Sequence, residues 1–146
     1  MKYLRALEYE EEHHICPFCD MPAYQILEKK KWMIVTPARA PYHAHHILIV
    51  PQRHVYLLQE LSKKEQEELF AMAKKWAKRL HTKHDDVVLY MKDSRIWWPA
   101  LKSVDHLHFH LIPDCPFGAN VGNSDRPFFD AKTFTKIIAK IKKAFL

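Results

Sequence analysis

The sequence predicts an α+β domain in which an antiparallel sheet of about five strands packs against one long helix and a C-terminal helix. Short strand-like segments follow one another without the regular alternation of strand and helix that a parallel sheet needs. Two longer segments, 62–81 and 130–145, carry apolar residues at helical spacing. At 146 residues, the chain has the length of one domain with its own hydrophobic core.

The first strands are predicted after an acidic N-terminal segment. Residues 1–15 end in a run of glutamates and two histidines, and we expect them to form a mobile lead-in. The segments 24–28 and 32–36 are expected to pair as strands joined by the lysines between them. A third strand is expected at 46–50 and ends at Pro51, because proline cannot donate a hydrogen bond to a strand ladder.

The long helix is predicted from its start signal. Ser62 and Glu65 have the spacing of a capping box, so we expect a helix from Ser62 to near His81. Its apolar residues recur at helical spacing, which places Trp76 in the core rather than in a binding platform.

Two more strands and a final helix complete the prediction. The segments 86–91 and 103–112 have strand character, and Asp130 is expected to cap the last helix. We expect 16–117 to hold the core and 118–146 to form a C-terminal extension containing that helix. The apolar stripe of the helix consists of Phe134, Ile137, Ile138, Ile141 and Phe145.

The most informative segment alternates histidines with apolar residues. His106, His108 and His110 are separated by single apolar positions, which is the period of a half-buried strand. In that geometry the imidazoles lie on one face, about 7 Å from one to the next. One histidine on a strand face is usually structural, whereas three in strict alternation indicate chemistry. Metal ligation and nucleophilic or acid–base catalysis at phosphate are the candidates.

Composition narrows the classes of partner. The formal charge of +6 favours anionic partners such as phosphates, nucleotides or nucleic acid, although the basic residues are dispersed. The only glycines, Gly118 and Gly122, cannot build a Walker loop or a dinucleotide fingerprint. The sequence contains neither a long apolar run nor a signal-like N-terminus, so we expect no membrane span and a cytoplasmic location.

The cysteines suggest a metal. Cys16 and Cys19 form a Cys-x-x-Cys pair, and Cys115 stands alone. Such a pair indicates zinc, redox chemistry or coincidence, and redox is disfavoured because no strand precedes the pair and no helix opens at it. Zinc needs two further ligands, usually histidines. Spacing alone does not choose among the candidates, which are His43, His45, His46, His54 and His106.

With these segments in view, the chain resembles the zinc-bearing branch of the histidine-triad (HIT) superfamily, including Hint-like hydrolases and nucleotidyltransferases of the galactose-1-phosphate uridylyltransferase type. The resemblance rests on residues 103–113 (SVDHLHFHLIP), on residues 46–54 (HILIVPQRH) and on the upstream Cys-x-x-Cys pair. It implies an antiparallel sheet with a long helix, paired into a homodimer. It also implies a structural Zn²⁺ held by Cys16, Cys19, His54 and His106.

The resemblance further implies a distinct role for each catalytic residue. His108 would be the nucleophile, His110 would contact the phosphate, and Ser103 would bond the phosphate or the leaving group. Attack on phosphorus requires an unprotonated imidazole, which is available near neutral pH.

The segment before the triad departs from the family pattern. Its usual glycines, asparagine and glutamine are absent, and Lys102 stands where glutamine is common. Lys102 and Arg95 could neutralise a phosphate. Trp97 and Trp98 could stack on a base, or could fill the core or a dimer interface. These departures leave the nucleoside and the leaving group unspecified.

The leading hypothesis is therefore a nucleotide hydrolase or nucleotidyltransferase acting on a phosphoanhydride or phosphoramidate bond through a nucleotidyl-histidine at His108. Nucleoside phosphoramidates, dinucleoside polyphosphates and nucleotide sugars are the candidate substrates. The alternative is a HIT-fold protein that binds nucleotide or a protein partner with little or no turnover. Nucleic-acid end processing is disfavoured, because residues 116–146 contain no cysteine or histidine for an additional zinc finger.

Overall fold

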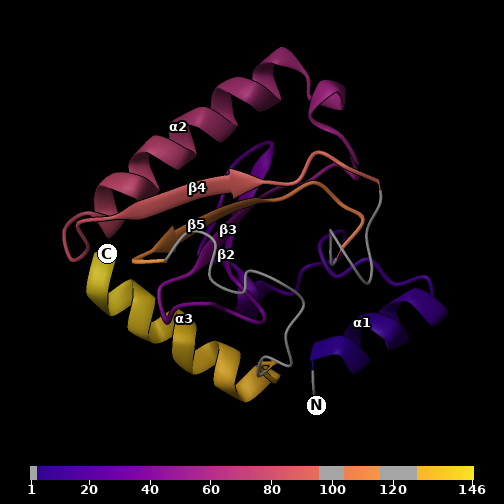
Figure 1. Ribbon diagram of the computed structural model, residues 1–146, viewed down its shortest axis with the longest axis horizontal. Helices are drawn as coiled ribbons and strands as arrows, with labels where there is room; N and C mark the ends of the chain where they lie inside the picture. The colour runs from indigo at the N-terminus through magenta and orange to yellow at the C-terminus, as the bar shows by residue number, and fades with distance from the viewer. Residues whose placement is uncertain (1–2, 96–103, 116–127) are drawn as a thin grey trace.

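A computed structural model of the chain describes residues 3–95, 104–115 and 128–146. Within them, five strands form one sheet in the order β1-β2-β3-β5-β4, and every neighbouring pair is antiparallel (Figure 1). The predicted α+β class with an antiparallel sheet is confirmed. The strands are β1 (Glu28–Lys29), β2 (Met33–Pro37), β3 (Ile47–Pro51), β4 (Val87–Met91) and β5 (Phe109–Pro113).

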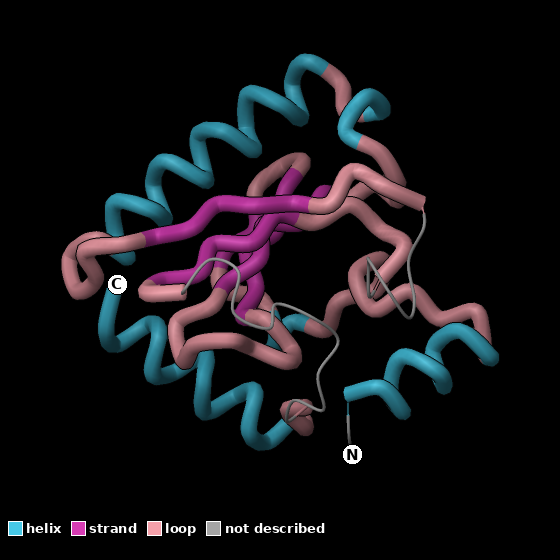
Figure 2. The backbone as a smooth tube through the Cα atoms, in the orientation of Figure 1, coloured by secondary structure: helices cyan, strands magenta, loops and turns pink. Residues whose placement is uncertain are grey.

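The α-helices among the described residues surround the strands (Figure 2). They are α1 (Tyr3–Glu12), α2 (Lys63–Leu80) and α3 (Ala131–Phe145), and the short 3-10 turns are η1 (Ala23–Gln25) and η2 (Leu58–Glu60). The sheet, α2 and α3 share one hydrophobic cluster, while α1 packs into a second cluster that contains other residues of β3. The two clusters cover opposite faces of the sheet, so β2 and β3 are buried on both sides.

The long helix begins as predicted. The Ser62 hydroxyl accepts the backbone N–H of Glu65 and the Glu65 carboxylate accepts that of Ser62, which completes the capping box. Trp76 is fully buried, and its Nε1 donates to Glu28 Oε1 at 3.0 Å. Asp130 caps α3 through the Thr133 N–H, which confirms the second start signal.

The N-terminal segment differs from the expected lead-in. Residues Tyr3–Glu12 form helix α1, because Tyr3, Ala6 and Leu7 lie on one helical face and bury it in the second cluster. The glutamates that suggested a lead-in occupy the polar part of the same helix, and Glu10 pairs with Arg39. The helical spacing of the apolar residues, rather than the overall acidity, was the decisive signal.

Two strands are shorter than predicted. Residues Ala23–Gln25 form the turn η1, so β1 is limited to Glu28–Lys29. Strand β5 starts at Phe109, six residues after the predicted start at 103. Its pairing with β3 extends only to Phe109, opposite Ile49, and the N–H of Leu107 donates instead to the Val55 carbonyl at 2.8 Å. The first two triad histidines, His106 and His108, therefore precede the strand, and only His110 lies in it.

No helix in the described ranges combines the length and apolar character needed to cross a bilayer.

Candidate functional site

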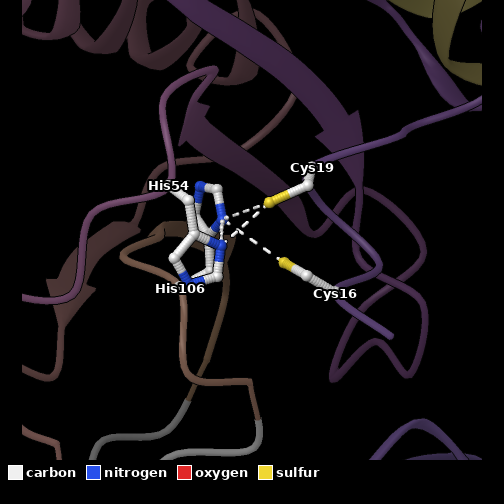
Figure 3. Close-up of side chains that lie close together, drawn as sticks. All are labelled: Cys16, Cys19, His54 and His106. Atoms are coloured by element: carbon white, nitrogen blue, oxygen red, sulfur yellow. Dashed lines mark hydrogen bonds between the residues drawn. The ribbon is translucent and has the colours of Figure 1, made fainter. Parts of the chain in front are cut away.

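Four side chains from distant parts of the sequence converge beside the end of β3 (Figure 3). Cys16 and Cys19 lie in the turn after α1, His54 follows β3, and His106 precedes β5. His106 Nδ1 lies 3.4 Å from Cys16 Sγ, 3.7 Å from Cys19 Sγ and 3.2 Å from His54 Nδ1. His54 Nδ1 lies 2.8 Å from Cys19 Sγ. The structure thus brings together the four residues that the resemblance implied as metal ligands.

The distances among these atoms fit a tetrahedral zinc ion. Bonds of about 2.3 Å to sulfur and about 2.1 Å to nitrogen put a sulfur–nitrogen pair about 3.6 Å apart and two nitrogens about 3.4 Å apart. All three separations from His106 Nδ1 agree with these values to about 0.2 Å. The Cys19–His54 separation is a hydrogen-bond length and would have to increase on metal binding.

The tautomer of His106 also fits a metal ligand. Its ring is fully buried, and its Nε2 lies 2.8 Å from the Pro51 carbonyl oxygen. A carbonyl can only accept, so Nε2 carries the proton and Nδ1 presents its lone pair toward the cysteines. Backbone carbonyls commonly orient metal-binding histidines in this way.

The Cys19 thiol is held in its protonated form when no cation is present. Burial, the hydrogen bond with Cys16 and the negative charges nearby raise the pKa of Cys19 to about 12. Metal ions bind the thiolate, so a bound cation would have to displace this proton. Together, the donor set and the geometry fit a closed Cys₂His₂ structural site.

His108 has a defined tautomer as well. Its Nδ1 donates to the backbone carbonyl of His106 at 2.7 Å, so in the neutral ring Nε2 carries the lone pair. The ring is only 7% exposed and packs against Phe18 of the Cys-x-x-Cys turn, with the ring centroids 5.3 Å apart. Phe18 also contacts His106, so the cysteine turn is packed against both histidines.

His110 belongs to a chain of hydrogen bonds that fixes its tautomer. The N–H of Tyr42 donates to His46 Nδ1 at 3.2 Å, and His46 Nε2 lies 2.9 Å from His110 Nδ1. Since the amide can only donate, neutral His46 carries its proton on Nε2 and passes a hydrogen bond to His110. His110 then carries its own proton on Nε2. Tyr90 stacks on this ring with the centroids 4.4 Å apart.

The sequence analysis named His46 only among the candidate zinc ligands and predicted no contact with the triad for this residue, which is 2% exposed. Its contact with His110 depends on the β3–β5 register, in which Leu48 pairs with His110, and no local sequence pattern predicts that register. Two residues before Leu48, His46 lies on the same face as His110.

Arg95 lies outside the triad. Its guanidinium pairs with Asp105 at 2.8 Å and stacks over Tyr56 at 3.7 Å from the ring centroid. Asp105 and Tyr56 also line a cavity of about 280 Å³ between α1 and the segment before β5, and His108 is not among the residues lining it. The other predicted substrate contacts, Lys102 and Trp97, lie outside the described residues, as do Trp98 and the predicted catalytic Ser103.

Comparisons with known proteins find a matching family model and a related protein. The family model described as HIT domain matches residues 20–116. The chain is 29% identical over 114 residues to adenosine 5'-monophosphoramidase hnt1 of Schizosaccharomyces pombe, with 73% of this chain and 81% of the relative covered.

Solved structures share the fold. A hypothetical histidine triad nucleotide-binding protein from Sulfolobus tokodaii superposes with a TM-score of 0.67 at 18% identity, covering 89% of this chain and 91% of that one. A Zn-bound histidine triad family protein from Mycobacterium smegmatis gives 0.58 at 19% identity, with 88% and 96% covered. A uridylyltransferase mutant gives 0.67 at 21% identity, covering 97% of this chain but 51% of the longer chain.

Proposed function

The chain belongs to the HIT domain family, and on that premise we propose that it is a nucleotide hydrolase or nucleotidyltransferase whose covalent intermediate forms on His108. The observation that carries the proposal is the hydrogen bond from His108 Nδ1 to the His106 carbonyl. It holds the proton on Nδ1 and leaves the lone pair on Nε2, which is the tautomer that a nucleophile needs.

The reaction would proceed in two displacements. His108 Nε2 forms a bond to the α-phosphorus, and the bond from phosphorus to the leaving group breaks with its electron pair on the leaving oxygen or nitrogen, which takes up a proton. Water or an acceptor phosphate then attacks the same phosphorus and releases His108 with the lone pair restored on Nε2. The choice of acceptor distinguishes a hydrolase from a transferase.

His110 would stabilise the charge that develops on the phosphoryl oxygens. The hydrogen bond from His46 keeps the His110 proton on Nε2, so this ring offers a donor rather than an acceptor. A donor held in advance of the reaction loses no energy to reorientation in the transition state. His46 and Tyr42 act through His110 and are therefore positioning residues.

Zn²⁺ would be a structural ion held by Cys16, Cys19, His54 and His106. When bound, it supplies folding free energy and keeps the cysteine turn against His106 and His108. The Zn-bound relative from Mycobacterium smegmatis supports this assignment.

The substrate class to test first is a nucleoside phosphoramidate, because the Schizosaccharomyces pombe relative is named as an adenosine 5'-monophosphoramidase. Ser103 is assigned to the phosphate or the leaving group, Lys102 and Arg95 to phosphate charge, and Trp97 to the base. Arg95 would have to exchange its contact with Asp105 for the phosphate. A homodimer and a cytoplasmic location complete the proposal.

The alternative is a binding protein with little or no turnover. It is favoured by the segment before the triad, where Lys102 replaces the usual glutamine and the usual glycines are absent. In this case nucleotide would bind without forming a bond to His108.

The deciding experiment compares wild type with His108→Ala on adenosine 5'-phosphoramidate and related nucleotides. We expect the variant to lose at least about 10³-fold in kcat/KM, since no other group replaces the nucleophile. His13→Ala is the matched control, because it removes an exposed imidazole whose contacts are with Tyr9 of α1.

Label from an α-phosphate should remain on wild-type protein after alkaline denaturation, a condition that preserves nitrogen–phosphorus bonds. Turnover of a folded His108→Ala protein at the wild-type rate would contradict the nucleophile assignment. Nucleotide binding without retained label would favour the binding protein.

A further inference from the structure

Three histidines that the proposed reaction does not use converge at the other end of the β3–β5 strand pair. His43 and His45 lie in the turn before β3, and His84 lies in the turn between α2 and β4. Each ring is partly buried, and the three offer ligand atoms that lie within 4.8 Å of one another. The rings also meet edge to face, with centroids 5.0–5.5 Å apart.

A carboxylate fixes the tautomer of His84. Its Nδ1 lies 2.7 Å from Asp114 Oδ2, so Nδ1 carries the proton and Nε2 presents its lone pair to the cluster. Asp114 follows β5 directly and takes a left-handed backbone conformation, φ 53°, while its N–H donates to the Asp86 carbonyl. A carboxylate behind the outer nitrogen of a histidine is a frequent arrangement around protein-bound zinc.

The other two rings lie close to this nitrogen, and the His45 ring contacts it directly. His45 Nδ1 lies 2.7 Å from His84 Nε2, a hydrogen-bond distance. His43 Nδ1 accepts the backbone N–H of His45 at 3.0 Å. Phe145, at the end of α3, packs its ring against His45 and covers one side of the cluster.

Burial, more than the nearby charges, favours the neutral form of two of the imidazoles in the cluster. Burial and the nearby His84 lower the pKa of His43, and burial, His84 and Lys83 lower that of His45. A neutral imidazole has the lone pair that a metal ion requires. Asp114 supplies a negative charge that would partly offset a cation, while Lys83 opposes it.

We propose that His43, His45 and His84 form a second metal site, which binds a divalent transition-metal ion such as Zn²⁺, Co²⁺ or Ni²⁺ with Asp114 as the carboxylate behind His84. Three imidazoles with no thiolate suit these borderline cations and not Ca²⁺ or Mg²⁺, which prefer oxygen ligands. Three protein ligands leave a position for water or an exchangeable ligand.

This site is expected to bind more weakly than the cluster of cysteines and histidines. Two nitrogens on one tetrahedral ion lie about 3.4 Å apart, so the His45–His84 contact of 2.7 Å must open by about 0.7 Å. His45 Nδ1 donates to His84 Nε2 in that contact, so its proton must move to the other nitrogen of the His45 ring before Nδ1 can bind a metal. His43 must also exchange its hydrogen bond with the His45 amide for a metal bond or turn its ring over, because a neutral imidazole has one lone pair. Both movements lie in turns rather than in strands.

The two metal sites are separate by topology. In the antiparallel pair, His45 precedes β3 and Asp114 follows β5, whereas His54 follows β3 and His106 precedes β5. The length of β3, about 17 Å for its residues, therefore lies between the sites. An ion at the second site would not share a ligand with the first.

The test uses full-length protein already loaded with one equivalent of Zn²⁺ and then dialysed against Co²⁺. We expect one Co²⁺ to be retained per chain, without the near-ultraviolet thiolate-to-cobalt absorption that entry into the cysteine site would produce. His84→Ala should raise the dissociation constant of this ion at least about tenfold. Asp114→Asn, which keeps all three imidazoles, should raise it by about 10- to 100-fold.

His13→Ala is the matched control and should retain Co²⁺ as wild type does, since its ring lies outside both clusters. Far-ultraviolet circular dichroism shows whether each variant is folded. If His84→Ala is not folded, Asp114→Asn still tests the proposal. The proposal is overturned if Co²⁺ appears only with thiolate absorption, if no second ion is retained, or if His84→Ala and Asp114→Asn bind it as tightly as wild type. In those cases the cluster is a hydrogen-bonded network alone.

Discussion

Replacing His46 tests whether the tautomer of His110 matters for catalysis. His46→Ala removes the ring that links the Tyr42 N–H to His110 Nδ1. The His110 proton is then no longer confined to Nε2, although the ring and its stacking on Tyr90 remain. A hydrogen bond contributes about 0.5–1.5 kcal/mol, so kcat/KM should fall by about 2- to 12-fold.

The loss expected for His46→Ala should be smaller than that for His110→Ala and should be largely recovered in His46→Gln. His110→Ala removes the donor itself and should cost about 10²–10³-fold, the effect of losing one donor to a developing oxyanion. His46→Gln should recover most of the loss, because its amide N–H can reach His110 Nδ1 without being able to titrate. Since His46 is buried, His46→Ala should also lower the free energy of unfolding by about 1–3 kcal/mol.

The assay is steady-state turnover of adenosine 5'-phosphoramidate at a temperature well below each variant's unfolding midpoint. If His46→Gln is no better than His46→Ala, or if His46→Ala is as inactive as His108→Ala, the positioning role is wrong. The second outcome would place His46 in proton transfer instead.

Three further predictions concern stability. Cys19→Ser, or prolonged chelation, should lower the unfolding midpoint in calorimetry by more than about 10 °C. Losing a structural zinc costs several kcal/mol, and each kcal/mol shifts the midpoint of a chain this size by a few degrees. Cys115→Ser is the control, and an equal loss in that variant would contradict the metal site. Burial alone would raise the pKa of Glu28, but hydrogen bonds from Lys75 and Trp76 lower it overall. The charged Glu28 carboxylate therefore stabilises the folded protein above its unfolded pKa, near 4.5, and this stabilisation is lost as the pH falls through the lower folded pKa. Glu28→Gln should flatten that acid limb in urea titrations, and an unchanged limb would refute the assignment. Ser62→Ala should cost about 1 kcal/mol by loss of the α2 cap, whereas Ser62→Asp should be nearly neutral.

Local patterns predicted the regular elements well. The capping box at Ser62, the buried Trp76 and the Asp130 cap depend on residues a few positions apart, and each has the predicted structure. Helix α1 was missed because its glutamates dominate the composition, while its buried face consists of a few residues whose partners lie far along the chain.

Long-range contacts explain what local patterns could not supply. The start of β5 depends on its pairing with β3, since the ladder between them ends at the pair Ile49–Phe109, within the alternation of His106 to His110. Likewise, His46 and His84 have no local signature. Their roles depend on the register that brings Leu48 opposite His110 and on the turn that brings His84 to Asp114.

The strand pair β3–β5 connects these features into one arrangement. The cluster of Cys16, Cys19, His54 and His106 lies at one end of the pair, and the cluster of His43, His45 and His84 lies at the other. The rings of His46, His108 and His110 lie between them. Leu107, Phe109 and Leu111 are buried in the cluster shared with α2 and α3, which holds the alternate positions of β5 toward the opposite face. Packing on one side of the strand therefore fixes which side carries the imidazoles. Backbone carbonyls and amides then set the proton positions, so the chemistry of each ring follows from where the strands begin and end.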